Sequence, residues 1–310
     1  MSPFITSLRL RTLPLSVAGI ILGTGLAYST PYTLHPTPYT IHHTPYTFIL
    51  SLLTALSLQI LSNLSNELGD ALKGTDADQH GRQAYGLQAG TITVPQMKRM
   101  ILLFVVLSIL FGSALIFTAF GSPIVNCFQS SINRPIVNRQ IVNILIFLGL
   151  GLLAIVGAIK YTLGKHSYGY MGLGDLGVFL FFGLLSTLGA YYLQTQTLTW
   201  EVFWCGVAVG LPCVGVLNLN NVRDMYNDRA HNKRTLAGAL GPIGAKCYHT
   251  VLLIAALAIM AIYAHLWSLC VLPVWAWHLW FVWTHDQSRL DTQMPVLMFS
   301  TLLFSVLACL

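Results

Sequence analysis

Two clusters of asparagine and aspartate stand out in a chain that carries very little charge. The first cluster contains Asn66 and Asp70, and the second contains Asn220, Asp224 and Asp228. Residues four apart lie on one face of a helix, so each cluster is predicted to point its side-chain oxygens at one place. Amide and carboxylate oxygens are the ligands that hard divalent cations prefer. Two such faces opposed across a cavity would form a site for Mg²⁺ and a phosphorylated substrate.

Basic side chains are interleaved with both clusters. Carboxylates alone suit a metal and basic groups alone suit a phosphate, whereas the combination favours a diphosphate that is bridged by metal ions. A single residue of this kind is as readily explained as a solvated surface or a helix cap. The candidate metal ligands are Asn66, Asp70, Asp76, Asp224 and Asp228. The candidate diphosphate-binding residues are Lys73, Arg82, Arg223 and Lys233.

The composition says which kind of element must hold these residues. The chain is 55% hydrophobic and 8% charged, whereas soluble domains have about 25% charged residues. Each apolar run is close to the roughly 20 residues that a helix needs to cross a membrane. The sequence therefore predicts an all-α, polytopic membrane protein of eight or nine transmembrane helices, and we count nine, in a single domain over residues 1–310. The predicted spans are residues 13–28, 48–64, 100–120, 141–159, 176–194, 202–219, 248–265, 267–284 and 294–310.

The distribution of Lys and Arg predicts how the chain is oriented. Positive charge is retained on the cytoplasmic side, and with the amino terminus inside, fourteen of the sixteen Lys and Arg residues fall inside. The exceptions are Arg134 and Arg139. We therefore expect a protein of the bacterial inner membrane whose amino terminus and acidic clusters face the cytoplasm. The net charge of +6 suits anionic lipid and an anionic substrate, and no basic stripe with aromatic residues predicts nucleic-acid binding.

Two low-complexity segments, at about residues 29–47 and 121–142, are predicted to be outer loops without a chemical role. The first repeats a Thr-Pro-Tyr-Thr unit, and the second repeats Ile-Val-Asn. The inner loops differ from these, because they hold most of the ionisable residues. Function is therefore expected at the cytoplasmic mouth of the helix bundle.

The ordered motifs resemble a known family. Residues 66–76 and 221–236 are similar to the two aspartate-rich motifs of the UbiA superfamily of intramembrane aromatic prenyltransferases. Other stretches resemble its 1,4-dihydroxy-2-naphthoate polyprenyltransferase branch, namely residues 10–14, 58–63, 86–90, 160–162, 170–175 and 182–183. The resemblance covers nearly the whole chain except the two repeat segments. Lys165 is a departure, since the family pattern has proline there.

The resemblance implies a nine-helix bundle around a central cavity that opens sideways to lipid. It implies that a polyprenyl diphosphate binds at the mouth through Mg²⁺, with Asp70, Asp224 and Asp228 as catalytic residues. An aromatic face can shelter the carbocation that forms when diphosphate leaves, and Tyr161 is the candidate. The acceptor implied is 1,4-dihydroxy-2-naphthoate, which loses CO₂ to give demethylmenaquinol in menaquinone synthesis. A carboxylate favours arginine, so Arg11 is the first acceptor-binding candidate and Lys165 the second.

Three alternatives remain open at this stage. The same superfamily includes enzymes with other acceptors, such as 4-hydroxybenzoate, and a phytyl donor would give phylloquinone instead of menaquinone. A cation-coupled transporter is a different class of protein that also uses acidic residues in a membrane. The length of the prenyl tail depends on how deep the packed groove is, which the residue pattern does not specify.

Overall fold

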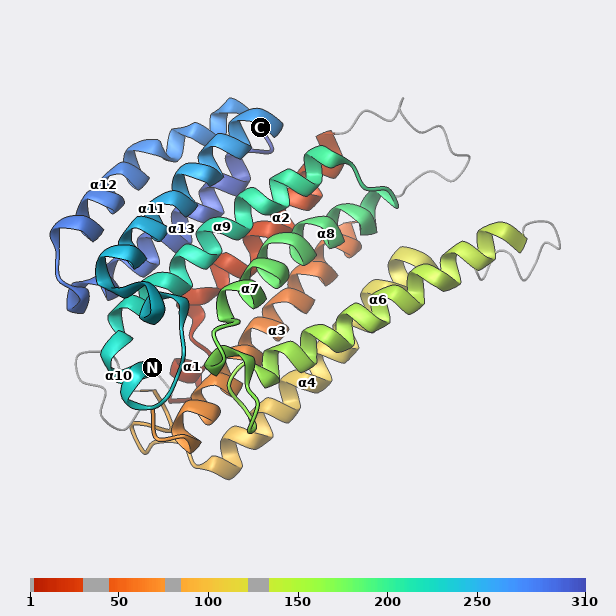
Figure 1. Ribbon diagram of the computed structural model, residues 1–310. Helices are drawn as coiled ribbons and strands as arrows, with labels where there is room; N and C mark the ends of the chain where they lie inside the picture. Colours follow the sequence, from red (N-terminus) through yellow and green to blue (C-terminus); the bar gives the residue numbers. More distant parts are fainter. Residues whose placement is uncertain (1–2, 30–44, 76–84, 122–133) are drawn as a thin grey trace.

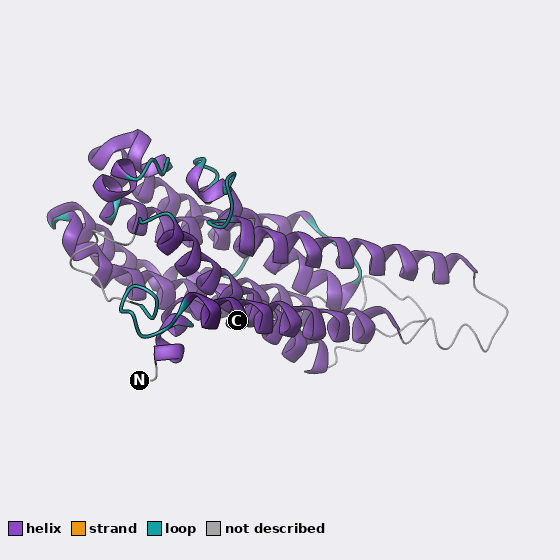
Figure 2. Cartoon of the chain, turned by 90° about the horizontal axis from the view of Figure 1, so that it is seen from below, coloured by secondary structure: helices purple, strands orange, loops and turns teal. Residues whose placement is uncertain are grey.

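The computed structural model describes residues 3–29, 45–75, 85–121 and 134–310, and these residues fold almost entirely into helices (Figures 1 and 2). In the described ranges there is no β-strand, only an isolated bridge between Met171 and Arg234. The α-helices are α1 (Pro3–Ser7), α2 (Leu13–Ser29), α3 (Pro45–Leu72), α4 (Val94–Ile116), α6 (Arg134–Lys160), α7 (Gly174–Val178), α8 (Ser186–Thr195), α9 (Trp200–Arg223), α10 (Met225–Ala230), α11 (Leu236–Tyr263), α12 (Leu272–Thr284) and α13 (Gln293–Leu307). Shorter 3-10 and π-helical segments are η1 (Leu10–Thr12), η3 (Phe117–Gly121), η4 (Tyr168–Tyr170), η5 (Phe179–Leu185), η6 (Leu266–Val271) and η7 (Gln287–Thr292).

These elements combine into nine apolar helices that are long enough to cross a membrane, counted over the described residues. The count confirms nine rather than eight, because η6 starts a new helix directly after α11 ends. The protein is therefore an integral membrane protein. The spans are Phe4–Ser29, Pro45–Leu72, Val94–Gly121, Asn138–Lys160, Gly174–Thr195, Trp200–Arg223, Leu236–Tyr263, Leu266–Thr284 and Gln287–Leu307.

Helix α9 is the centre of the bundle. In its most apolar 18-residue window 78% of the residues are buried, against 6% in the fourth span, which contains α6. Small residues let the neighbours approach closely: a Cβ added at Gly183 in η5 would lie 2.5 Å from the Cα of Gly210 in α9. Helices α4 and α6 lie along one side of the bundle and α12 along the opposite side (Figure 1). The exposed side chains of α4 and α6 are largely leucine, isoleucine and valine, as expected of lipid-facing helices.

Two of the differences from the predicted helices lie beside the second acidic cluster. The seventh span begins at Leu236, not at residue 248, and Gly241 interrupts it with a φ of 73° immediately before Pro242. Helix α9 ends at Arg223, and Asp224 joins it to the separate helix α10. The residues of this cluster therefore do not share one continuous helix face. Backbone hydrogen bonds from Asp224 to Asn220 and from Asp228 to Asp224 still keep them one turn apart.

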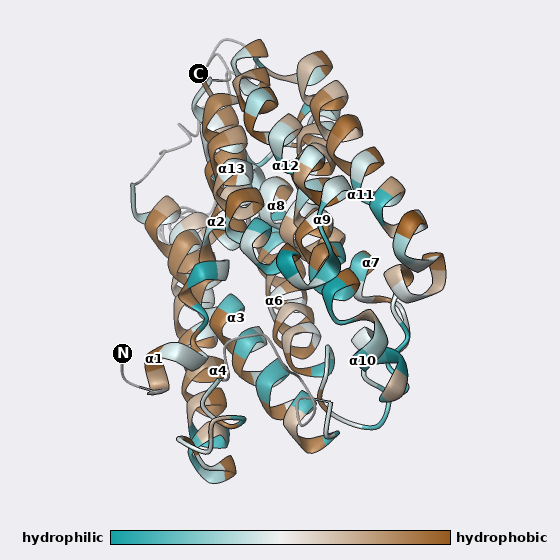
Figure 3. Ribbon diagram, turned by 90° about the vertical axis from the view of Figure 1, so that its left-hand side faces the viewer, coloured by the Kyte–Doolittle hydropathy of each residue, from teal (hydrophilic) through white to brown (hydrophobic). Residues whose placement is uncertain are grey.

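Both acidic clusters lie at the same end of the bundle. Figure 3 shows hydrophilic residues gathered around α10 and the adjacent ends of α3 and α9, while the outward surfaces of the long helices are mainly hydrophobic. The amino terminus lies at this end too (Figure 1). Most of the two low-complexity segments lies outside the described residues, so their predicted role stays a prediction.

Candidate active site

The first acidic cluster lies in the last turns of α3, as predicted. Asn66 and Asp70 both line an internal cavity. Asp70 accepts a hydrogen bond of 2.7 Å from the hydroxyl of Tyr170, and Asn66 accepts one of 3.2 Å from Thr162. The helix can approach the chain after α6 this closely because residue 69 is glycine: a Cβ there would lie 2.5 Å from the hydroxyl oxygen of Thr162. The segment after α6 therefore orients both oxygen-bearing side chains.

Lys73, a predicted diphosphate ligand, is held by the same segment. Its ammonium donates to the carbonyl of Thr162 at 2.7 Å and to the hydroxyl of Ser167 at 2.5 Å. It also lies 3.5 Å from the centre of the Tyr170 ring. Burial lowers the pKa of Lys73, and nearby Asp70 opposes that shift. In this arrangement Lys73 fixes the loop behind Asp70, and it does not line the cavity.

In the second cluster, Asp224 forms a salt bridge with its neighbour Arg223. The guanidinium of Arg223 donates to the two carboxylate oxygens of Asp224 at 2.7 and 2.6 Å, and to the side chain of Asn220 at 2.8 Å. It also donates to Asp291, at the carboxyl-terminal end of η7. Arg223, Asp224 and Asn220 all line the cavity. The arginine thus holds this carboxylate at the cavity wall.

Asp228 lies one layer behind Asp224 and does not line the cavity. It is 1% exposed, and the ammonium of Lys233, which does line the cavity, lies 3.2 Å from its Oδ1. Burial raises the pKa of Asp228 to about 6, although Lys233 opposes the shift. The pKa of Lys233 is raised: burial alone would lower it, but the nearby acidic groups, Asp228 first among them, outweigh that effect. The cation of Lys233 therefore stands between Asp228 and the cavity.

Tyr170 joins the two clusters. Its hydroxyl lies between Asp70 and the hydroxyl of Thr75, at 2.7 and 2.6 Å. Lys233 lies 5.7 Å from its ring centre, beside the closer contact of Lys73. A second link runs from the side chain of Asn227, which donates to the carbonyl of Thr75 at 2.9 Å. Burial and the nearby Asp70 raise the pKa of Tyr170, so its hydroxyl remains a neutral donor.

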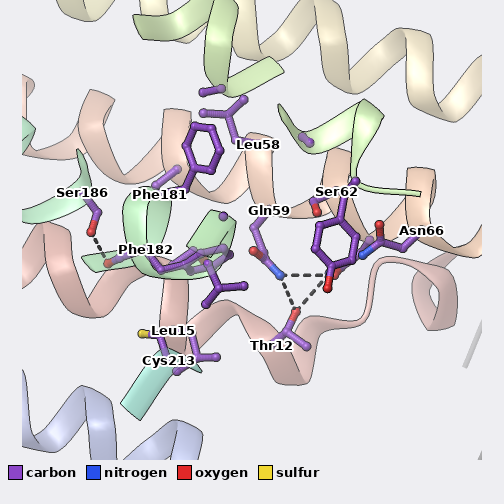
Figure 4. A pocket seen from close by; sticks show the side chains of 18 of the residues that line it. Thr12, Leu15, Leu58, Gln59, Ser62, Asn66, Phe181, Phe182, Ser186 and Cys213 are labelled. Carbon is purple, nitrogen blue, oxygen red and sulfur yellow. Dashed lines mark hydrogen bonds between the residues drawn. The ribbon is translucent and has the colours of Figure 1, made fainter. Parts of the chain in front are cut away.

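The cavity has a volume of about 380 Å³ and two chemically different parts. Its mouth is lined by the oxygen-bearing and cationic side chains of both clusters, and its body by leucine, phenylalanine and small residues. Both Asp70 and Ser51 line it, and they are about 28 Å apart along α3 at 1.5 Å per residue. Between these ends the side chain of Gln59 donates to Thr12 at 3.0 Å and to Asn63 at 3.1 Å, in one polar network (Figure 4). Phe181 and Phe182 line the body beyond it (Figure 4).

A separate basic group lies at the mouth, around Tyr85. The guanidinium of Arg11 donates to the Tyr85 hydroxyl at 2.8 Å and lies 3.5 Å from Asp291. The guanidinium of Arg9 covers the Tyr85 ring at 4.1 Å, with its backbone in the left-handed region at a φ of 50°. Arg9, Arg11 and Tyr85 all line the cavity. Two cations are thereby held at one side of the mouth.

The other predicted site residues fall into three groups. Tyr161 lines the cavity, and its ring packs edge-on against Tyr168 at 5.2 Å. Lys165 is exposed and does not line the cavity, so the structure does not bring it to the site. Asp76 and Arg82 lie outside the described residues, and their predicted roles stay predictions.

The oxygen ligands at the mouth fit a divalent cation, although they are not assembled into a finished site. Over the described part of the chain, no group of three or more His, Cys, Asp or Glu side chains stands close enough to hold a metal. The physical reason is that Arg223 and Lys233 occupy the carboxylates of the second cluster. One oxygen of Asp228 is buried without a hydrogen-bond partner, which is costly unless a cation or water satisfies it. The donor set of carboxylate and amide oxygens is the one that Mg²⁺ prefers.

The sequence did not point to four residues: Arg9 and Tyr85, which line the cavity, and Tyr170 and Asp291, which contact residues that line it. A weak signal existed for Tyr170, because two tyrosines alternate with glycines at 168–172 between the fourth and fifth spans. Asp291 carried no comparable signal. It lies outside any repeated motif, and it contacts Arg11 across 280 positions of sequence.

Comparison with known proteins agrees with this geometry. A model of the UbiA prenyltransferase family matches residues 140–303. The chain is 40% identical over 274 residues to the 1,4-dihydroxy-2-naphthoate octaprenyltransferase of Escherichia coli (strain K12), covering 88% of this chain and 79% of that protein. The chain belongs to the UbiA prenyltransferase family. Among solved structures, a UbiA homolog from Aeropyrum pernix K1 aligns with a TM-score of 0.62 at 15% identity, over 94% of this chain and 96% of that one.

A UbiA homolog from Archaeoglobus fulgidus bound to GPP and Mg²⁺ aligns with a TM-score of 0.61 at 14% identity, over 98% of each chain. At such identities the two structural matches establish the shared UbiA fold. The predicted helix bundle is therefore confirmed, with nine spans over the part of the chain that the structure describes and with the UbiA fold.

Proposed function

We propose that this protein transfers a polyprenyl group from its diphosphate to 1,4-dihydroxy-2-naphthoate, releasing diphosphate and CO₂ and giving demethylmenaquinol. The observation that carries the proposal is one cavity that joins a charged mouth, built from both acidic clusters, to a long apolar body. Such a shape suits a donor with an anionic head and a hydrocarbon tail. The 40% identity to a protein named for this acceptor supports the choice of naphthoate over 4-hydroxybenzoate.

The donor's diphosphate binds at the mouth in this proposal. Mg²⁺, when bound by oxygens of Asn66, Asp70, Asp224 and Asp228, supplies positive charge to the leaving diphosphate. Lys233, at the cavity wall, adds a cation beside it, and Tyr170 holds Asp70 in place. The tail lies in the apolar body, where it replaces contacts with lipid. Membership of the UbiA prenyltransferase family separately favours prenyl transfer over a cation-coupled transporter.

The chemical step forms one C–C bond and breaks two bonds. The allylic C–O bond of the donor breaks and its electron pair leaves with diphosphate, while the ring carbon that bears the carboxylate attacks the carbocation. The bond to the carboxylate then breaks, CO₂ leaves, and its electron pair restores the aromatic ring. Tyr161 lines the cavity near Asp70, and its ring face can stabilise the carbocation. Burial raises the pKa of Tyr161, so its hydroxyl stays protonated and does not trap the cation as a phenolate would.

The acceptor's carboxylate binds to Arg11 in this proposal, with Arg9 beside it. Arg11 keeps 34% of its side chain exposed, so it can reach an anion that enters the mouth. A planar guanidinium matches a carboxylate with two hydrogen bonds. We also propose that the mouth faces the cytoplasm of a bacterial inner membrane, where the water-soluble acceptor and Mg²⁺ are supplied.

The test uses membranes that contain the protein, with Mg²⁺ and prenyl diphosphates of increasing length. Dihydroxynaphthoate and 4-hydroxybenzoate are offered together, phytyl diphosphate is included among the donors, and products are identified by mass. We expect decarboxylated, polyprenylated naphthoquinol, and its loss when Mg²⁺ is chelated. Replacing Asp70 with Asn should reduce turnover by at least about 100-fold, as expected when a charged ligand at the leaving group is lost. Asp286→Asn, in an exposed position away from the cavity, is the matched control.

Prenylated 4-hydroxybenzoate as the sole product would refute the choice of acceptor. Full turnover by Asp70→Asn would refute the proposed role of the first acidic cluster. A phytylated product in preference to every polyprenyl product would move the protein to phylloquinone synthesis.

A further inference from the structure

Asp291 does not itself line the cavity, but it bridges two arginines that do, one in each half of the mouth. It lies in the last turn of η7, just before α13, and far in sequence from both acidic clusters. Its Oδ1 accepts a hydrogen bond from Arg223 of the second cluster, and its Oδ2 lies 3.5 Å from Arg11 of the basic group around Tyr85. One carboxylate is thus shared by an arginine from the donor side and an arginine from the acceptor side.

On the donor side, Arg223 has two anionic partners. Its side chain is 8% exposed, so it must remain paired with an anion, since an unpaired buried charge is very costly. At present it holds both oxygens of Asp224 and also reaches Asp291. A Mg²⁺–diphosphate complex at the mouth would draw on the same oxygens of Asp224. Asp291 is the carboxylate that can still neutralise Arg223 when Asp224 binds the Mg²⁺–diphosphate complex.

On the acceptor side, the attachment of Arg11 to Asp291 is weak. The 3.5 Å contact is long for a charged hydrogen bond, and Asp291 is 28% exposed. The shorter bond of Arg11 goes to the Tyr85 hydroxyl, and this bond keeps the guanidinium at the mouth without neutralising it. Arg11 can therefore exchange Asp291 for another carboxylate with little movement.

We propose that Asp291 is a positioning residue that couples donor binding to acceptor binding. When Mg²⁺–diphosphate takes Asp224, Arg223 moves fully onto Asp291, and Arg11 loses its share of that carboxylate. Arg11 then presents an unneutralised charge to the acceptor. The inference rests on the proposed function, because it requires that the diphosphate and the aromatic carboxylate bind in these two places.

The consequence is an order of events that suits the chemistry. The acceptor binds tightly only when the leaving group is already seated, so both reactants occupy the cavity together. Coupling of this kind is reciprocal, which means that each ligand must tighten the other by the same factor. Couplings between sites typically change affinity by about 5-fold to 150-fold.

The test measures equilibrium binding without turnover. The affinity of purified protein for dihydroxynaphthoate is determined alone and then with Mg²⁺ and inorganic diphosphate, which has no prenyl group to transfer. Wild-type protein should bind the acceptor at least about 5-fold more tightly in the second condition. In Asp291→Asn the two affinities should be equal, and both should approach the tighter wild-type value, because Arg11 no longer shares an anion.

Two variants serve as controls. Asp286→Asn removes the same charge from the same inner loop without touching either arginine, so its coupling should match wild type. Asp291→Glu keeps the charge and should retain the coupling. A residue that only stabilised the fold would not raise acceptor affinity when it is replaced.

A second measurement uses wild-type protein and 1,4-dihydroxynaphthalene, which lacks the carboxylate that would draw Arg11 away. Mg²⁺–diphosphate should leave its affinity unchanged, and this result does not depend on how well any variant folds. Coupling that persists in Asp291→Asn or with 1,4-dihydroxynaphthalene would overturn the inference. So would independent binding of the two ligands to wild-type protein. Failure of dihydroxynaphthoate to bind under either condition would instead overturn the proposed function.

Discussion

Asp70 and Asp228 differ in their side-chain partners and in their burial, and these differences bear on how Asp228 titrates. Asp70 lies at the cavity wall with a neutral phenol as its donor, whereas Asp228 lies behind Lys233 and is almost fully buried. Burial raises the pKa of Asp228 to about 6. Its charge is therefore expected to change close to physiological pH.

The first prediction concerns Mg²⁺ affinity in the presence of inorganic diphosphate. A metal ligand must be deprotonated, so wild-type affinity should fall as the pH drops below about 6, by up to tenfold per pH unit. Asp228→Asn should bind weakly at every pH. The ratio of wild-type to variant affinity is the quantity to measure, because the protonation of diphosphate itself cancels in that ratio. We expect the ratio to be constant above pH 6 and to approach one below it, whereas a ratio independent of pH would contradict the role of Asp228.

For single residues, the sequence predicted side chains that are spaced along one helix. It did not predict contacts between residues that are distant in sequence. Asn66 and Asp70 could be predicted because the four-residue spacing of a helix places them together. Tyr85 and Asp291 could not, since each is a single residue in a short segment and acquires its role only through arginines that are distant in sequence. The sequence also suggested Lys165 as an acceptor ligand, but the turn that begins at Gly164, with a φ of 91°, leaves that side chain exposed.

Among the elements, η5 packs closely against α9, the helix that leads into the second acidic cluster. A Cβ at Gly183 would lie 2.5 Å from the Cα of Gly210 and 2.9 Å from the carbonyl oxygen of Gly206. Both are backbone atoms, so the two helices would have to separate. Apolar runs in the sequence predicted the two spans. They did not predict this close packing, because the chain has 26 glycines and nothing in the pattern distinguishes those at a helix contact.

Gly183→Ala is therefore expected to lower the free energy of unfolding by about 1–3 kcal/mol, the usual cost of overpacking a core. The measurement is the thermal unfolding midpoint in detergent. Gly189→Ala is the matched control, because a Cβ at that position meets no atom within 4 Å. Equal midpoints for the two variants would show that η5 and α9 do not pack as closely as described.

For the whole molecule, the membrane orientation is the prediction that remains to be measured. The structure places the amino terminus and both acidic clusters at one end, and the Lys and Arg distribution predicts that this end is cytoplasmic. In a variant without its six cysteines, one new cysteine is placed at Ala89 or at Leu198, both exposed. An impermeant thiol reagent added to intact cells should label position 198. Position 89 should react only after the membrane is opened, and labelling of both from outside would contradict the orientation.

The number of spans could be predicted from composition alone, since each apolar run approaches the thickness of a bilayer. The order of the helices around the cavity could not, because the hydropathy of a span does not say which other spans it packs against. What makes α9 central is its content of small residues and the close contacts they permit, which only the packed structure reveals.

The division of the cavity into a charged mouth and an apolar body also bears on how the product leaves. In the proposed reaction both anionic groups are lost, one as diphosphate and the other as CO₂. The prenylated quinol then has nothing for the cations at the mouth to bind, and the apolar walls hold its tail no better than lipid does. Chemistry itself thus removes the attraction that retained the reactants, so the product can pass into the bilayer without a gate to expel it.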